Sequence, residues 1–134
     1  MALLEGEIKR TVLCFVFERK ENKVLMILKK RGQGAGKVNV PGGKLQPGET
    51  AEQAAVRETR EETGIEPQSL KLAGQLEFYF PENGNWDNTC TVFTSENFSG
   101  RLIPESEECL AYWENVNKIP LEKMWDAEIG RAHV

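Results

Sequence analysis

Histidine is almost missing from this chain: the only one among 134 residues is His133, next to the last position. Ser-His or Cys-His catalysis and a histidine-rich zinc site are therefore disfavoured. Cysteine is also scarce, since Cys14, Cys90 and Cys109 form an odd set without the short spacings of metal ligands. We expect three reduced thiols and a cytoplasmic location.

Long hydrophobic runs and an excess of positive charge are missing too. No apolar run approaches the ~20 residues that span a bilayer, and the N-terminal MALLEGEIKR has no signal-peptide core. The formal net charge is −4, whereas a protein that binds nucleic acid polymers needs a basic surface. We therefore expect neither a membrane nor a nucleic-acid polymer as partner.

What is present is an ordinary globular composition, with 40% hydrophobic and 28% charged residues. This length suits one domain, 1–134, and the alternation of apolar segments and turns predicts a mixed α/β fold. A stretch rich in glycine and proline, 31–50, predicts loops that bend sharply. The expected strands are 9–19, 24–31, 70–80, 89–98 and 109–116, and the expected helices are 50–63 and 120–129.

The helix 50–63 has clear local signals at both ends. Thr50 followed by Gln53 forms a capping box, and Gly64 is a typical C-terminal stop. One stripe of this helix begins with small alanines, which suit packing on a sheet, and continues with three glutamates. The stripe consists of Ala51, Ala54, Ala55, Glu58, Glu61 and Glu62.

The spacing of Glu58, Glu61 and Glu62 places like charges together on one face, which destabilises an isolated helix. A hard divalent cation would resolve this conflict, because Mg²⁺ prefers oxygen ligands. The alternative is a solvated acidic face on which Arg57 and Arg60 serve as intrahelical partners.

The wider spacing distinguishes these hypotheses. Seven positions fit G-x5-E-x7-R-E-x-x-E-E-x-G, and chance agreement is about one in 10⁸ per starting point at ordinary residue frequencies. The stretch 43–65 thus resembles the signature of the Nudix hydrolases, although Thr59 stands where the family usually has an aliphatic residue. The matching positions are Gly43, Glu49, Arg57, Glu58, Glu61, Glu62 and Gly64.

The resemblance implies a hydrolase that acts on a nucleoside diphosphate linked to another group and that uses Mg²⁺ or Mn²⁺. By analogy, Glu58, Glu61 and Glu62 would hold the metal together with the Gly43 carbonyl. Glu49 would pair with Arg57 and keep the loop in register with the helix. The general base would be one of these glutamates or Glu105, which is otherwise an ordinary loop acid.

Similarity outside the signature points to the branch that contains MutT and the mammalian oxidised-purine nucleoside triphosphatase. It implies an α/β/α sandwich with a central mixed sheet and a pocket for the base. Asn39 and Phe78 also have simpler explanations, as a turn residue and a core aromatic. The residues that align with the pocket are Asn39, Phe78, Trp125, Lys29, Thr11 and, in an alignment without gaps, Glu128.

This chain departs from that branch in three places. Gln33 replaces a phenylalanine of the glycine loop. In an alignment without gaps Ala127 and Glu128 replace two adjacent aspartates that contact the base edge, whereas a slip of one residue would place Asp126 and Ala127 there. Few residues follow Trp125, so we expect the C-terminal helix to be shorter than in relatives. A curtailed helix would leave apolar sheet surface that self-association could cover, so monomer and homodimer both stay open.

Three hypotheses for function follow. The first is a Mg²⁺-dependent nucleoside triphosphate pyrophosphohydrolase that converts 8-oxo-dGTP to 8-oxo-dGMP and pyrophosphate. The second is a Nudix hydrolase of a dinucleoside polyphosphate, a nucleotide sugar or ADP-ribose. The third is a nucleotide-binding module without turnover, which the three intact glutamates disfavour.

Overall fold

The computed structural model describes residues 9–32, 35–79, 88–119 and 131–133, with the backbone alone for 78–79 and 131–133. The expected helix 120–129 lies outside these residues. Among them, no helix is long and apolar enough to cross a bilayer. The elements are β1 Lys9–Glu18, β2 Lys23–Lys29, β3 Val38–Asn39, β4 Gly42–Lys44, α1 Ala51–Thr63, β5 Ile65–Gln68, β6 Lys71–Tyr79, β7 Asn88–Ser95, β8 Asn97–Gly100, β9 Cys109–Asn115, the 3₁₀ turn η2 Val116–Lys118 and β10 Arg131–His133.

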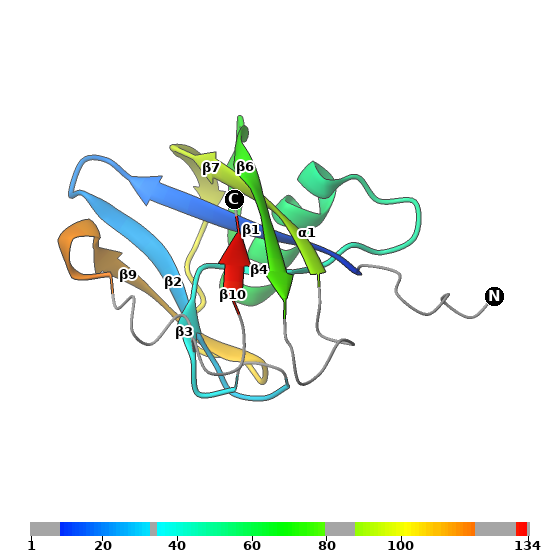
Figure 1. Ribbon diagram of the computed structural model, residues 1–134. Coiled ribbons are helices and arrows are strands. Elements are labelled where there is room, and N and C mark those ends of the chain that lie inside the picture. The colour runs from blue at the N-terminus through cyan, green and yellow to red at the C-terminus, as the bar shows by residue number, and fades with distance from the viewer. Residues whose placement is uncertain (1–8, 33–34, 80–87, 120–130, 134) are drawn as a thin grey trace.

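A mixed sheet forms the centre of the molecule (Figure 1), in the order β10-β6-β7-β1-β2-β3, with β4 paired to β1 and β9 paired to β2. Strands β1 and β7 run parallel, whereas the other pairs in this sheet are antiparallel. The first half of β1 contacts β4 and its end contacts β2. Strand β1 therefore links the glycine loop to both halves of the sheet.

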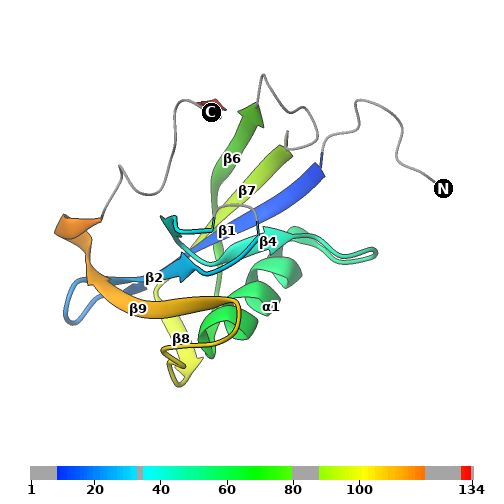
Figure 2. The same ribbon diagram turned by 90° about the horizontal axis from the view of Figure 1, so that it is seen from below.

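Helix α1 covers one face of this sheet, as the view from below shows (Figure 2). Successive side chains of a strand point to opposite faces, so Val12, Cys14 and Val16 of β1 share the helix side. They pack with Ala54 and Ala55 of α1 in one cluster in which all five are at most 1% exposed. The small alanines let the helix approach β1 closely, which fixes the position of the glutamates further along the helix.

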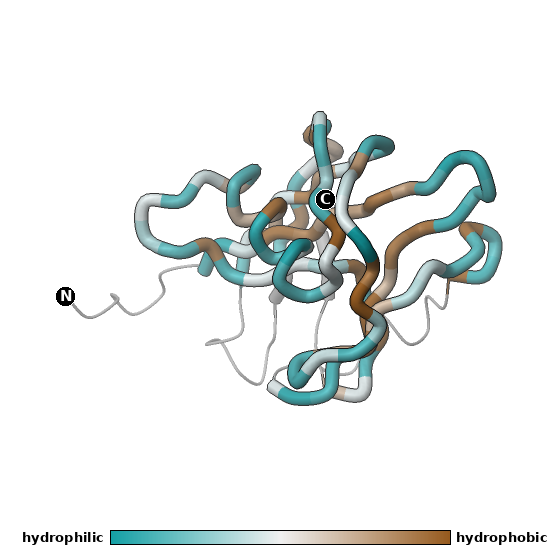
Figure 3. The backbone as a smooth tube through the Cα atoms, turned by 180° about the vertical axis from the view of Figure 1, so that it is seen from behind, coloured by the Kyte–Doolittle hydropathy of each residue, from teal (hydrophilic) through white to brown (hydrophobic). Residues whose placement is uncertain are grey.

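A second apolar cluster lies on the other side of β1 and β2. Leu13 and Phe15 are partly buried there against Val24, Met26 and Val40. In the backbone view from behind, hydrophobic segments follow the strands through the interior, whereas the turns between them are hydrophilic (Figure 3). The core of the described residues thus has a cluster on each side of β1, and a third, smaller cluster of Ile27, Cys109 and Ala111 where β2 pairs with β9.

The far end of α1 is held by a separate two-stranded sheet, β5 with β8. Gly64 ends the helix at φ +79°, and its N–H donates to Arg60 O. Ile103 N then donates to Thr63 O at 2.8 Å. The first bond closes the last turn of α1, and the second ties the helix end to the segment after β8.

The expected strands and helix largely agree with these elements. Segments 9–19, 24–31, 70–80 and 109–116 correspond to β1, β2, β6 and β9, and helix 50–63 corresponds to α1 with Thr50 as its cap. The prediction of one strand over 89–98 was wrong, because the chain bends at Glu96 and forms β7 and β8. Strands β3, β4, β5 and β10 were not predicted.

Candidate active site

The N-terminal end of α1 is built as its sequence predicts. The Thr50 hydroxyl accepts the Gln53 N–H at 3.1 Å, while Gln53 Oε1 accepts the Thr50 N–H at 3.0 Å. This reciprocal pair satisfies two amides that have no partner inside the helix. The loop before the helix is thereby held at a fixed angle to it.

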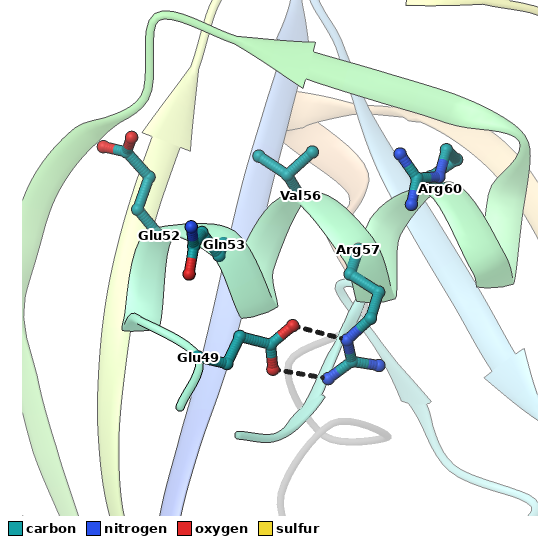
Figure 4. A pocket seen from close by; sticks show the side chains of 6 residues that line it. All are labelled: Glu49, Glu52, Gln53, Val56, Arg57 and Arg60. Atoms are coloured by element: carbon teal, nitrogen blue, oxygen red, sulfur yellow. Dashed lines mark hydrogen bonds and ion pairs between the residues drawn. The ribbon is translucent and has the colours of Figure 1, made fainter. Parts of the chain in front are cut away.

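Glu49, the last residue before the cap, forms a two-pronged ion pair with Arg57 (Figure 4). Arg57 Nε and Nη2 lie 2.7 and 2.9 Å from the two Glu49 oxygens. Nη2 also donates to Lys44 O at 3.0 Å. The guanidinium, together with the Gln46 N–H, lowers the pKa of Glu49 to about 2. Arg57 thus fastens both the loop and β4 to the helix, the role that the resemblance implied.

Glu58, Glu61 and Glu62 follow along the same helix, and each has a partner. Arg57 Nη1 bonds to Glu58 and lies 3.3 Å from Glu61 Oε2. Glu62 Oε1 accepts the Gly42 N–H at 3.0 Å. Glu58 and Glu62 are therefore held by one arginine and one backbone amide, whereas the Glu61 side chain is 57% exposed beside the same arginine.

The Gly43 backbone lies directly against this acidic cluster. A Cβ at Gly43 would lie 2.3 Å from Glu58 Oε2, well inside contact distance. A larger residue there would displace the end of the flexible Glu58 side chain, whereas a Cβ at Gly42 would lie 2.1 Å from the backbone oxygen of Val12. The Gly42 N–H and the Lys44 carbonyl of β4 both bond to polar side chains of α1.

The electrostatics of the cluster favour added positive charge. Burial raises the pKa of Glu62 to about 8, and Glu58 adds to the rise while Gly42 N–H and Lys29 oppose it. Burial also raises the pKa of Glu58, against the lowering effect of Arg57. A partly buried carboxylate with like-charged neighbours is costly to ionise, and a cation relieves this cost.

The donor set fits a hard divalent cation in type, because carboxylate and backbone oxygens are the ligands that Mg²⁺ prefers. The side chains are not yet arranged for it: among the described residues, no three acidic, histidine or cysteine side chains are grouped as a metal site. An ion would compete with Arg57 for Glu58 and Glu61. The residues thus fit the metal chemically, with Arg57 serving as the counter-charge in this conformation.

Glu105, the other candidate for general base, is occupied elsewhere. Lys30 Nζ donates to Glu105 Oε2 at 2.6 Å and to Ser106 O at 2.8 Å. The ammonium lowers the pKa of Glu105, which makes it a weaker base in this conformation. Lys29, the last residue of β2 and the neighbour of Lys30, is close enough to Glu62 to lower the pKa of that carboxyl.

The residues expected around a base are only partly brought together. Thr11 in β1 donates its hydroxyl to Asn88, and Asn88 is paired across the sheet with Phe78. Asn39, in β3, is paired with Ile27 of β2, and the Asn39 Oδ1 accepts the Val40 N–H at 2.8 Å. The expected site residues Trp125 and Glu128, and the departures at Gln33 and Ala127, lie outside the described residues.

Some residues of the site were not foreseen from the sequence. Gly42 supplies the amide for Glu62, and Lys44 supplies a carbonyl for Arg57. The Gly-Gly pair gave a signal for close backbone approach, but a backbone carbonyl leaves no trace in residue type. Thr59 is fully buried, and its hydroxyl donates to Ala55 O at 2.7 Å. A threonine is therefore accommodated where an aliphatic residue is usual.

A mixed sheet, a helix with three glutamates beside a glycine strand, and an arginine that joins loop to helix define a class of nucleotide hydrolases. The family model described as NUDIX domain matches residues 7–132. This chain belongs to the Nudix family.

Similar proteins include two named oxidized purine nucleoside triphosphate hydrolase. The Danio rerio protein is 39% identical over 118 residues, which cover 88% of this chain and 74% of that protein. The Mus musculus protein is 37% identical over 77% of this chain and 65% of its own length. The 8-oxo-dGTP diphosphatase of Escherichia coli (strain K12) is 46% identical over 66 residues, 48% of this chain and 51% of that protein.

Solved structures show the same fold. A MutT NUDIX hydrolase from Burkholderia pseudomallei superimposes with a TM-score of 0.75 at 23% identity, covering 86% of this chain and 88% of that one. A MutT protein from Bacillus halodurans gives a TM-score of 0.74 at 27% identity, covering 90% and 76%. The mixed α/β fold of the described residues, with α1 on a central sheet, is therefore the Nudix fold.

Proposed function

We propose that this chain is a Nudix hydrolase of phosphoric anhydride bonds that converts oxidised purine nucleoside triphosphates, such as 8-oxo-dGTP, to the monophosphate and pyrophosphate. The observation that carries this proposal is the match to the Danio rerio oxidized purine nucleoside triphosphate hydrolase across most of both chains. The intact glutamate cluster against Gly43 supports turnover rather than binding alone.

Glu58, Glu61 and Glu62, with the Gly43 carbonyl, would hold Mg²⁺, for which Mn²⁺ can substitute. The metal, when bound, supplies positive charge that attracts a polyphosphate and stabilises the charge that develops during displacement at phosphorus. Arg57 keeps the loop and β4 against the helix through Glu49 and Lys44 O, so that the glutamates stay in place. A cluster glutamate would act as the general base, because Lys30 holds Glu105 in an ion pair.

The base would lie against residues that align with the pocket of those relatives. We assign this contact to Thr11, Asn39, Phe78, Lys29, Trp125 and Glu128. The partner is thus a small nucleotide, and neither a nucleic-acid polymer nor a membrane is part of the proposal. We further propose a cytoplasmic protein, supported by its three free cysteines, that acts as a monomer or homodimer.

A substrate panel with Mg²⁺ tests this function by separating the products chromatographically. Monophosphate and pyrophosphate from 8-oxo-dGTP, with kcat/KM well above that for dGTP, are the expected result. Equal values for the two nucleotides would refute the preference for oxidised bases. Turnover of ADP-ribose, a nucleotide sugar or a dinucleoside polyphosphate alone would refute the triphosphatase assignment. Tight nucleotide binding without any product would indicate a binding module.

A further inference from the structure

A hydrogen bond joins β1 to β7 on the sheet near the glutamate cluster. Thr11 Oγ1 donates to Asn88 Oδ1 at 2.7 Å, between residues that are 77 positions apart in the chain. Both side chains are partly exposed. Asn88 was not foreseen as a site residue, because its partner is distant in sequence.

This bond lies on the sheet face that α1 does not cover. Val12 and Cys14 point toward the helix, so their neighbour Thr11 points to the other face. The parallel register pairs Thr11 with Cys90 and Lys9 with Asn88. Asn88, two residues from Cys90, therefore shares the face of Thr11, and the two side chains meet diagonally across β1 and β7.

The same face begins beside the acidic site. Thr11 is paired with Lys44 of β4, and the next residue of β1 is paired with Gly43, whose backbone contacts Glu58. One residue of a strand spans about 3.4 Å. Strand β4 pairs only with β1 among the described strands, so it forms an edge of the sheet there. A nucleotide whose phosphates lie at the glutamates would reach the face that carries Thr11 and Asn88 across this edge.

The chemistry of the bond sets the polarity of that face. A hydroxyl has one proton to donate and two lone pairs to accept. Since Thr11 gives its proton to Asn88, it presents only lone pairs to a ligand. The Cys90 thiol is paired with Thr11 across the two strands: burial raises the pKa of this thiol, and a hydrogen bond with the Thr11 hydroxyl opposes the rise. The neutral thiol directs its own weak hydrogen bond to Thr91 O at 3.9 Å.

We propose that Asn88 is a positioning residue for base recognition: it holds the Thr11 hydroxyl as a hydrogen-bond acceptor, so that this face selects bases that present an N–H group to β1. The inference rests on the proposed function, because it concerns the base of the same nucleotide. Without Asn88 the hydroxyl would rotate freely, and its preference for a donor over an acceptor would be lost.

The test compares Asn88→Leu, which removes the acceptor, with Asn88→Asp, which keeps it. Thr11→Val and the double variant Thr11→Val/Asn88→Leu complete a cycle. Steady-state kinetics use the nucleoside triphosphate that the wild type hydrolyses fastest, and thermal melting checks the fold of each variant. We expect Asn88→Leu to raise KM about tenfold for a substrate whose base donates to Thr11, because the freed hydroxyl is no longer held with its lone pairs toward the base, with kcat little changed.

Asn88→Asp should recover most of the affinity, and the double variant should lose no more than Thr11→Val alone. Unchanged KM in Asn88→Leu, losses that multiply in the double variant, or equal defects in the Leu and Asp variants would each overturn the role of Asn88. If the wild type hydrolyses no triphosphate, the proposed function fails instead. Calorimetry then measures the Kd of dGMP and of 8-oxo-dGMP for the same variants. The role of Asn88 is supported if Kd rises in Asn88→Leu, recovers in Asn88→Asp and is no higher in the double variant than in Thr11→Val, and it is refuted otherwise.

Discussion

Arg57 explains at the level of single residues how three glutamates are tolerated on one helix face. Its guanidinium contacts Glu49, Glu58 and Glu61, and its side chain is only 14% exposed. Glu62 is left to the Gly42 amide instead. The Arg57 contacts are those expected of an acidic face with intrahelical partners, although Arg60 pairs with Glu66 instead. Burial of Glu58 and Glu62, which raises the pKa of both carboxyls, is what favours a site that accepts a cation.

Conservative loss of one carboxylate should remove activity without unfolding the protein. Glu62→Gln keeps the shape and the hydrogen bond from Gly42 but removes the charge, so we expect kcat to fall at least about 100-fold at saturating Mg²⁺. Pyrophosphate release measures this loss, and circular dichroism checks the fold. The matched control is Glu52→Gln in the first turn of the same helix, which should keep wild-type activity. A fully active Glu62→Gln enzyme would count against the ligand role.

The Glu49–Arg57 pair should give stability a defined pH dependence. The pKa of Glu49 is lowered from 4.5 to about 2 in the folded protein, so the folded state favours the ionised form. The pair therefore stabilises fully above about pH 4.5 and loses its effect as pH falls toward 2. Urea unfolding of wild type and Glu49→Gln should differ at pH 6, and this difference should shrink at pH 3. A constant difference would refute the assignment.

At the scale of elements, the sequence predicted the parts whose signals are local. Helix α1 has a capping box, a glycine stop and a periodic apolar stripe within fifteen residues, and strands β1 and β2 have continuous apolar segments. These features need no distant partner. Their boundaries agree with the structure to within about two residues.

Short strands were missed because distant partners create them. Strand β4 consists of Gly42, Gly43 and Lys44, residues with weak strand propensity that pair only because β1 is adjacent. Strand β5 contains Pro67, which ordinarily argues against a strand, yet it forms the edge pair with β8. Tertiary pairing outweighs local preference in both cases.

The end of α1 offers a stability test with a matched control. Gly64 and Gly48 both have φ +79°, but a Cβ at Gly64 would lie 2.4 Å from Arg101 O, while at Gly48 it would meet nothing within 4 Å. We expect Gly48→Ala to cost about 1 kcal/mol from backbone strain and Gly64→Ala at least about 1 kcal/mol more. Urea denaturation measures both. Equal costs would show that the helix end is not crowded.

At the scale of the whole molecule, the fold brings together residues whose contacts could not be predicted from the sequence. The glutamate box was predictable because its seven residues lie within 22 positions. The Thr11–Asn88 bond and the Lys30–Glu105 pair each join residues at least 75 positions apart. Only the folded register of β1 with β7, and the approach of loop 104–108 to β2, bring them together.

Burial in the core should also slow the reaction of the three cysteines with thiol reagents. Cys14, Cys90 and Cys109 are at most 2% exposed, and burial raises the pKa of Cys14 and of Cys90 to about 11. We expect the native protein to react with a thiol reagent such as DTNB at pH 8 at least about 100-fold more slowly than the urea-unfolded chain. Rapid release of three equivalents from the native protein would contradict this packing.

The claim on which the proposed activity depends is that Glu58, Glu61 and Glu62 together bind a divalent cation. Electron paramagnetic resonance of free Mn²⁺, titrated with protein, measures this binding directly. The wild type and Glu52→Gln should lower the free Mn²⁺ signal equally, whereas a variant with glutamine at all three positions should leave it unchanged. Equal binding by the triple variant, or no binding by the wild type even with a nucleotide present, would contradict the claim.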